Sequence, residues 1–311
     1  MAVMAGQRRR AGAAVRFPTR EARCYHLVFA GADVREWALL DPTELADRTG
    51  RWLHGRADAA LVDLVTRLID RGEAVRTETL ARPPGPALPA VISPTDLGDA
   101  RARLEAATDV LRIDARNPPA PGVGYPGLWC ALAVAGAAAQ ATGGVWLDAG
   151  SLRVRGTATP LPTPGLVRMG DHMLVAQTVE GDTALLSTTG LGSFGLPELL
   201  VAGVPTALAP AAALVLQGLA QRLIEGLVGD LADATTRGEV PAELVVTGTL
   251  VARSAPGSRV RKAGAARVRL AYRPPSDDDG PDHLAVEPAA ADERRSRAEW
   301  LRSIVGELLS G

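Results

Sequence analysis

The order of helical and strand patterns along the chain constrains its fold more than any other feature. Segments with apolar residues at helical spacing and segments with strand character come in separate runs, not in strict strand–helix–strand alternation. The predicted helices start at Asp41 and Ser93 and cover 57–70, 127–142, 205–231 and 292–309. The predicted strands cover 22–30, 110–114, 145–148, 151–155, 172–180, 183–189, 243–253 and 266–273. The sequence therefore predicts an α+β fold, in which a mixed or antiparallel sheet with hairpins packs against several helices.

Two proline-rich segments, 81–89 and 159–164, interrupt these runs. The second separates an N-terminal α+β half, 21–158, from a C-terminal α+β half, 165–311. A chain of 311 residues is long enough for one body or for two small subdomains, so the halves form one compact domain or two adjacent ones. Residues 1–20 contain five arginines and no acid, and we interpret them as a disordered basic arm.

Composition narrows the class of protein without indicating an activity. Hydrophobic residues make up 47% of the chain and charged residues 22%, as in soluble globular proteins. Lys262 is the only lysine among 34 basic residues, and such a preference for arginine suggests translation from a GC-rich bacterial genome. A net charge of −1 provides no general attraction to nucleic acid or anionic membranes. Cys24 and Cys130 have no metal-ligand spacing, so we expect free thiols and a cytoplasmic location.

Two long uncharged stretches, 117–147 and 199–221, have the length of a membrane span. Both are rich in alanine and glycine, and Pro126, Pro205 and Pro210 interrupt them. Because a membrane span needs strongly apolar side chains and not merely the absence of charge, we expect buried helices and no membrane insertion. No secretory signal follows the basic arm.

A glycine-rich motif, G-x-G-x-x-G, covers Gly190–Gly195 directly after a predicted strand. In a dinucleotide site such glycines let the backbone approach a pyrophosphate, and an acid about 20 residues further on binds the ribose. Here Pro197 interrupts the expected helix start, and no acid lies between Glu198 and Glu225. The motif therefore favours a bend with structural glycines over a nucleotide site.

Histidine, serine and cysteine form no catalytic or metal-binding motif. Cys24 and His26 lie at i and i+2 of a strand, but a zinc site needs two further ligands, and the sequence supplies none. We therefore predict neither a metal nor a cofactor. His172 and Ser193 remain the candidate catalytic residues, as base and nucleophile of a hydrolase.

The segment from Arg253 to Arg273 contains seven basic residues and no acid. Alternation places Arg267, Arg269 and Arg273 on one face of a predicted strand, and these are the candidate binding residues for phosphates. Aspartates at 277, 278, 279 and 282 follow at once and are expected to neutralise the arginines, and no aromatic residues offer stacking. Nucleic-acid binding is therefore not expected.

The predicted C-terminal helix carries a continuous apolar stripe that must be buried. The stripe consists of Trp300, Leu301, Ile304, Val305, Leu308 and Leu309. We expect it to dock on the chain's own sheet; the alternative is a seam with a second copy or with another protein.

Three motifs resemble those of a group of uncharacterised bacterial α+β proteins. They are Thr142-Gly143-Gly144-Val145 followed by Asp148, the run Thr189-Gly190-Leu191 with Phe194-Gly195 and Pro197-Glu198-Leu199, and Gly203-Val204-Pro205. The resemblance covers about 97–210. It implies an α+β fold for a domain of unknown function, and no activity.

No pattern in the sequence couples a nucleophile, a base and an orienting acid. We therefore expect a non-catalytic binding or protein-interaction module. The alternative is a hydrolase whose site lies near the Thr188–Glu198 bend, where glycine amides would bind an oxyanion or a phosphate.

Overall fold

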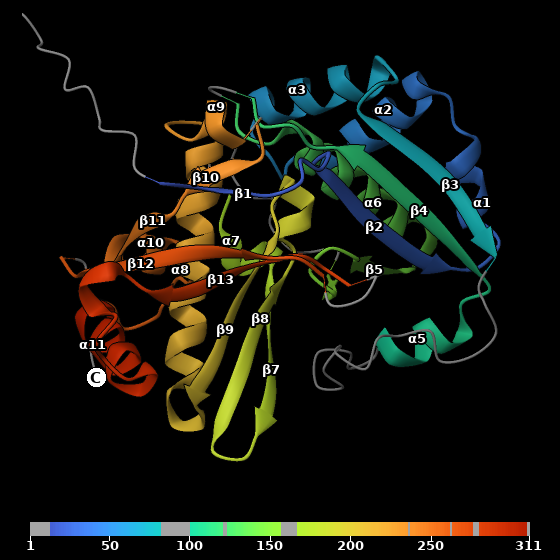
Figure 1. The fold of residues 1–311 in the computed structure, drawn as a ribbon. Coiled ribbons are helices and arrows are strands. Elements are labelled where there is room, and N and C mark those ends of the chain that lie inside the picture. Colours follow the sequence, from blue (N-terminus) through green and yellow to red (C-terminus); the bar gives the residue numbers. More distant parts are fainter. Residues whose placement is uncertain are drawn as a thin grey trace, which may run out of the picture.

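The computed structural model describes residues 13–81, 100–120, 123–156, 167–235, 237–261, 263–275 and 280–309. The fold is α+β, as predicted, with mostly antiparallel sheets and helices packed against them (Figure 1). The proline-rich segments lie outside the described residues for the most part, as do the expected helix start at Ser93 and the aspartates 277–279.

The N-terminal half contains a five-stranded sheet with the order β3-β4-β2-β5-β6. Its strands are β2 (Arg23–Ala30), β3 (Val75–Ala81), β4 (Asp109–Arg116), β5 (Val145–Asp148) and β6 (Arg153–Arg155). Its helices are α1 (Val34–Leu39), α2 (Pro42–Leu53), α3 (Ala59–Asp70), α5 (Ala100–Ala106) and α6 (Pro126–Thr142). Helix α6 packs on β2 and β4, α2 and α3 pack on α6, and α1 contacts β3 and β4.

Alternation along β2 determines which helix covers which face of this sheet. Val28 belongs to the main core, whereas its neighbour Phe29 belongs to a smaller cluster with Leu104 of α5. Alanines let α6 lie close to the sheet, and its residues from Gly127 to Ala139 are buried. This half therefore has one thick helical layer and one thin layer.

The C-terminal half contains a six-stranded sheet with the order β11-β12-β13-β9-β8-β7. Its strands are β7 (Leu174–Glu180), β8 (Thr183–Thr189), β9 (Glu198–Pro205), β11 (Glu243–Thr247), β12 (Ala265–Arg273) and β13 (His283–Pro288). Its helical segments are α7 (Met169–His172), η1 (Leu191–Phe194), η2 (Thr206–Leu208), α8 (Ala209–Leu227), α9 (Ala232–Thr235), α10 (Gly248–Ser254), η3 (Ala290–Asp292) and α11 (Arg297–Leu308). Neighbouring strands are antiparallel except for β13 and β9, which are parallel. Helix α8 packs along β8, β9 and β11.

The expected disordered arm is in part ordered. Strand β1 (Ala14–Arg16) pairs with β10 (Glu239–Pro241), and Phe17 is buried in the main core. Arg16 forms an ion pair with Glu239, and Arg20 forms one with Asp282. An apolar side chain and two acids far away in the sequence thus hold residues 13–20, and this context cannot be read from a basic N-terminal composition. Residues 1–12 lie outside the described part.

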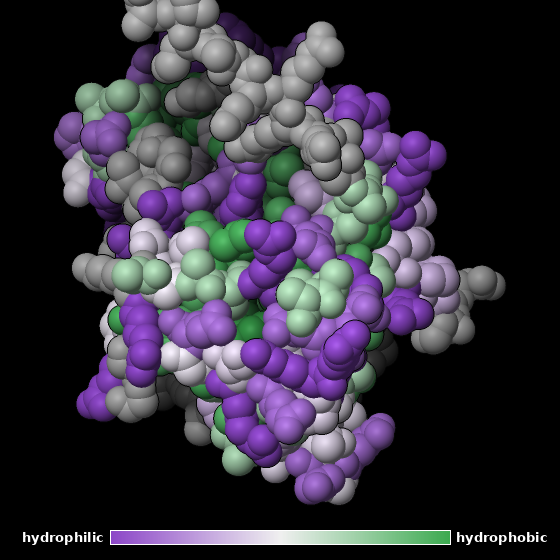
Figure 2. All heavy atoms as spheres, turned by 60° about the vertical axis from the view of Figure 1, so that its left-hand side comes forward, coloured by the Kyte–Doolittle hydropathy of each residue, from purple (hydrophilic) through white to green (hydrophobic). Residues whose placement is uncertain are grey.

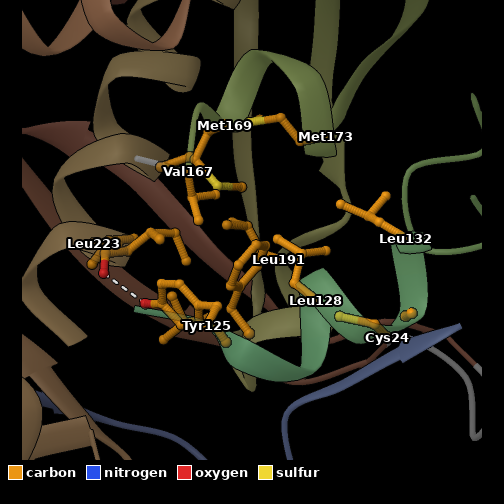
Figure 3. Close-up of a cluster of buried hydrophobic side chains, with 14 of the residues drawn as sticks. Cys24, Tyr125, Leu128, Leu132, Val167, Met169, Met173, Leu191 and Leu223 are labelled. Carbon is orange, nitrogen blue, oxygen red and sulfur yellow. Dashed lines mark hydrogen bonds between the residues drawn. The ribbon is translucent and has the colours of Figure 1, made fainter. Parts of the chain in front are cut away.

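The two halves share one continuous hydrophobic core. Figure 3 shows its central part, where Cys24, Tyr125 and Leu128 of the N-terminal half meet Met169, Met173 and other residues of the C-terminal half. The ring of Tyr125 meets that of Phe194 edge-on, with centroids 4.9 Å apart. The halves have separate sheets, but they pack as one body.

Three predicted elements differ from the observed ones. The predicted strand 243–253 ends at Thr247, whose hydroxyl accepts a hydrogen bond from Leu250 N and caps α10. The glycine bend does not lead into a helix: the unpredicted β9 follows it, and α8 begins only at Ala209. His172 lies in the short helix α7 and not in β7. A further unpredicted strand, β13, pairs with both β12 and β9.

The expected docking of the C-terminal helix is confirmed. Trp300 of α11 is only 1% exposed, and the helix contacts β9, β12 and α8 of the same chain. On the face turned forward in Figure 2, green apolar areas are small and purple polar side chains interrupt them. The apolar stripe of α11 is therefore buried against other parts of the same chain.

One helical stretch in the described part, Thr206–Leu227, is long and apolar enough to span a membrane by length and composition. Of its most apolar window, 56% is buried inside the protein. Core helices of soluble proteins pass the same test, so the stretch is weak evidence for a span.

Candidate functional site

The amides of the glycine-rich bend, Gly190–Gly195, already bind an anionic group of the chain, the carboxylate of Glu198. The carboxylate of Glu198 accepts hydrogen bonds from the N–H groups of Gly190, at 3.0 Å, and Gly192, at 3.1 Å. Its second oxygen accepts a hydrogen bond of 2.7 Å from the hydroxyl of Thr188. The amides that would bind a phosphate or an oxyanion are thus occupied by a side chain eight and six residues further on.

His172 belongs to a buried polar cluster that we call the arginine–aspartate cluster: Asp148 of β5, Arg155 of β6 and His172 of α7. Nη2 of Arg155 lies 2.8 Å from Oδ2 of Asp148 and 3.1 Å from Nδ1 of His172. The same nitrogen donates to the carbonyl oxygen of Asp171 at 2.6 Å. All three side chains are more than nine-tenths buried. The cluster joins the two halves, because β5 and β6 belong to one and α7 to the other.

Burial beside Arg155 keeps the ring of His172 neutral. A guanidinium group only donates hydrogen bonds, but the two hydrogens of Nη2 already have closer acceptors in Asp148 and the carbonyl oxygen of Asp171, so the contact with Nδ1 leaves both tautomers of His172 open. Burial, with the charge of Arg155 in support, lowers the pKa of His172 to about 3. Nε2 has no hydrogen-bond partner in the described part of the chain. His172 is therefore neutral near pH 7, and it is a weak base for a serine hydroxyl.

His26 and Trp146 extend the cluster into the sheet. The indole N–H of Trp146 donates to Nδ1 of His26 at 3.1 Å, and burial lowers the pKa of His26 to about 4. Burial alone would raise the pKa of Asp148, but interactions with His26 and Arg155 hold it below the usual value. Oδ1 of Asp148 also accepts from the N–H groups of Gly150 and Ser151. The cluster therefore holds one fixed ion pair between two neutral imidazoles.

Ser193 lies beside the same turn but is not joined to His172. A Cβ atom built on Gly150 would lie 2.4 Å from Oγ of Ser193, so this turn and η1 are in close contact. No hydrogen bond between Ser193 and His172 exists in the structure, whereas the carbonyl oxygen of Ser193 accepts one from Asn117 at 3.0 Å. The two candidate catalytic residues thus lack the geometry of a nucleophile and its base.

The basic strand is neutralised, by residues other than the expected ones. Arg267 pairs with Glu243, and both Arg269 and Arg273 pair with Glu287. Arg269 also pairs with Glu293. Of the aspartates that the sequence suggested, Asp282 pairs with Arg20, and the other three lie outside the described residues. Strand pairing brings the glutamates opposite the arginines, and spacing along the sequence does not reveal this.

The cysteines lie apart from any metal-binding arrangement. Within the described residues, no group of three or more His, Cys, Asp and Glu side chains is placed to hold a metal ion. Cys24 and His26 share the buried face of β2, as the alternation predicts. Burial raises the pKa of Cys24 well above its usual value and that of Cys130 to about 12, so both carry a thiol and no thiolate.

A groove between α1, α2 and α6 was not anticipated from the sequence. It has a volume of about 410 Å³ and is open to solvent. We call it the indole–arginine groove; its lining consists of Trp37, Arg48, Arg51, Trp52, Ala137, Gln140 and Ala141. The spacing of Arg48 and Arg51 with Trp52 on one amphipathic helix is the signal that could have indicated it.

Polar contacts hold the two indoles in the wall of the groove. The guanidinium of Arg48 lies 5.7 Å from the ring centre of Trp37, and that of Arg56 lies 4.9 Å from the ring centre of Trp52. Oε1 of Gln140 accepts from the indole N–H of Trp52 at 3.0 Å and from Arg56 at 2.7 Å. The walls of the groove are therefore preorganised.

Arg51 differs from its neighbours. Arg48 pairs with Glu36 and Glu44, whereas Arg51 is exposed and has no hydrogen bond or ion pair within the described part of the chain. The groove thus presents a guanidinium without a partner among the described residues, in a lining of polar side chains, alanines and two nearly buried indoles.

No family model matches the chain, and no curated protein or solved structure shows significant similarity to it. The resemblance to uncharacterised bacterial proteins therefore stays a prediction.

Proposed function

We propose that this protein is a non-catalytic binding protein and that it binds through the indole–arginine groove. The observation that carries this proposal is Arg51, a guanidinium without a partner among the described residues, in a hollow whose other walls include two fixed indoles. Tryptophan and arginine are the residue types that contribute most to binding at protein interfaces. Because the indoles are already held in place, a ligand would not have to order them.

The hydrolase alternative has less support. It needs a base that accepts a proton from Ser193, but no hydrogen bond joins Ser193 to His172, and burial lowers the pKa of His172 to about 3, which makes it a weak base. It also needs free amides for an oxyanion, and Glu198 occupies those of Gly190 and Gly192.

The ligand that fits the groove is an acidic segment of another protein. A guanidinium binds carboxylates in a bidentate geometry, so Arg51 favours an acidic side chain. A small molecule in an open groove would keep much of its surface in water, whereas small-molecule sites usually bury most of the ligand. Trp37 and Trp52 are only 3% and 7% exposed, so Arg51 provides the main contact, and an extended polypeptide can continue beyond the groove.

The test uses two short fluorescein-labelled peptides, in which leucines alternate with glutamates in one and with lysines in the other. Fluorescence anisotropy measures the binding of each to the full-length protein. We expect the acidic peptide to bind, with an affinity that falls as salt is added, and the basic peptide not to bind. Arg51→Glu should reduce the affinity for the acidic peptide by roughly tenfold or more, because it replaces an attraction with a repulsion.

Arg302→Glu is the matched control, since Arg302 is an exposed arginine on the distant helix α11. This variant should bind the acidic peptide as the unsubstituted protein does. Equal binding of both peptides, or an affinity that Arg51→Glu leaves unchanged, would contradict the proposal.

A further inference from the structure

A second hollow lies where the two halves meet, far along the chain from the groove residues of α1 and α2. It has a volume of about 230 Å³. Its walls come from the loop before α6, from Val167, and from α8 and α10: Gly124, Tyr125, Val167, Gln221, Ile224, Glu225, Val228 and Arg253. We call it the junction pocket.

The inner wall of the junction pocket is apolar and fixed. Tyr125, Val167 and Ile224 are all less than a tenth exposed. The hydroxyl of Tyr125 donates to the carbonyl oxygen of Ile224 at 2.6 Å, the bond drawn as a dashed line in Figure 3. Burial raises the pKa of this phenol, so it stays neutral. A ligand would therefore contact the small exposed parts of these side chains and the half-buried Val228, where the hydrophobic effect would hold its apolar part.

The polar side of the pocket carries one negative and one positive group. Gln221 is held by Met169 N and Val167 O, and its side-chain amide donates to Oε1 of Glu225 at 2.9 Å. The same oxygen of Glu225 accepts from Nη1 of Arg253 at 2.5 Å. Within the described residues, no hydrogen bond reaches Oε2 of Glu225 or Nη2 of Arg253. About a third or more of each of these two side chains is exposed to solvent.

This arrangement matches a small zwitterion with an apolar side chain. An ammonium group fits the free oxygen of Glu225, a carboxylate fits the free nitrogens of Arg253, and a short hydrocarbon chain fits the wall of Tyr125 and Ile224. An exposed ion pair contributes little to the free energy of folding, so a ligand can insert between its two charges with a small loss of stability. The volume is below the range of drug-sized ligands, which limits the ligand to about the size of a single amino acid.

We propose that the junction pocket binds a free α-amino acid with an aliphatic or thioether side chain. This site is separate from the indole–arginine groove, so either proposal can fail without the other. Binding would join residues of both halves and would stabilise the folded chain by mass action.

Isothermal titration calorimetry and thermal unfolding of the full-length protein test this proposal with L-leucine and L-methionine. Isocaproate, which lacks the amine, and isoamylamine, which lacks the carboxylate, are the matched probes. We expect the amino acids to bind and raise the melting temperature, and each single-charge analogue to bind at least about tenfold more weakly.

Two variants locate the site. Arg253→Met should reduce the affinity for leucine by at least about tenfold, and Val228→Phe should abolish binding by filling the pocket. Arg267→Met, which removes an exposed ion-paired arginine of β12, is the control and should leave binding unchanged. The proposal is overturned if neither amino acid binds, if isocaproate binds as tightly as leucine, or if binding survives both Arg253→Met and Val228→Phe.

Discussion

Two buried carboxylates shape turns of this chain in the same way. Glu198 accepts hydrogen bonds from the N–H groups of Gly190 and Gly192, and Asp148 from those of Gly150 and Ser151. In each case the acid satisfies main-chain donors that would otherwise be unpaired inside the protein. Glycines that resemble a ligand-binding loop at the level of sequence thus form a bend that is closed by its own side chain.

A substitution of Gly195 tests whether the glycines of the bend have a structural role. Its φ of +75° lies in the left-handed region, and an added Cβ would lie 2.9 Å from the carbonyl oxygen of Arg20. Gly195→Val should therefore lower the free energy of unfolding by about 1–3 kcal/mol, measured by urea denaturation. Gly306→Val is the control, because a Cβ at Gly306 meets no atom within 4 Å. An unchanged melting temperature together with lost binding of a nucleotide would instead show that the glycine motif is a ligand site.

Among the secondary-structure elements, α11 shows how local and tertiary signals combine. Ser296 and Glu299 form a capping box at its start, and Trp300, Leu301 and Ile304 turn toward the sheet. The cap favours the helix, and the burial of its apolar stripe against β9 and α8 stabilises the fold.

The indole of Trp300 is the largest side chain in this contact. Trp300→Ala should reduce the free energy of unfolding by about 3–5 kcal/mol, because it leaves a cavity between α11 and the sheet. Arg302→Ala, on the exposed side of the same helix, should change it by less than about 0.5 kcal/mol. Equal effects of the two substitutions in a chemical-denaturation experiment would contradict the docked position of α11.

At the scale of the whole molecule, the arginine–aspartate cluster connects the halves and makes their stability depend on pH. His172 and His26 have pKa values near 3 and 4 in the folded protein, against 6.5 for the ordinary group. Below pH 6.5 the unfolded chain binds protons at these positions and the folded chain does not. The free energy of unfolding therefore falls as the pH falls from about 6.5 toward 4.

His172→Gln removes one of the two histidines that bind a proton in the unfolded chain but not in the folded chain. The slope of unfolding free energy against pH should then be shallower by roughly 1.4 kcal/mol per pH unit between about pH 6 and pH 4. Urea denaturation at several pH values measures this slope. The exposed His54 serves as the control for loss of one histidine through His54→Gln. If both substitutions change the slope equally, His172 is not held neutral by its surroundings.

The sequence by itself determined the elements whose signals are local. The cap at Asp41 and the apolar stripe of 57–70 predict α2 and α3, and the hairpin turns predict the pairing of β5 with β6 and of β7 with β8. The burial of Trp300 follows equally, because six apolar residues on one helical face must leave water. These inferences need only neighbours within a few residues, so no knowledge of the fold is required.

Only the tertiary structure decided the contacts between distant segments. Strand pairing sets Glu243 and Glu287 opposite the arginines of β12, and the meeting of β6 with α7 gives His172 a cation as its partner instead of a carboxylate. The groove and the junction pocket arise where helices from separate parts of the chain approach one another. The physical reason is that charge and hydrogen bonding act through space, and many of the residues that meet in these sites come from separate elements of the chain.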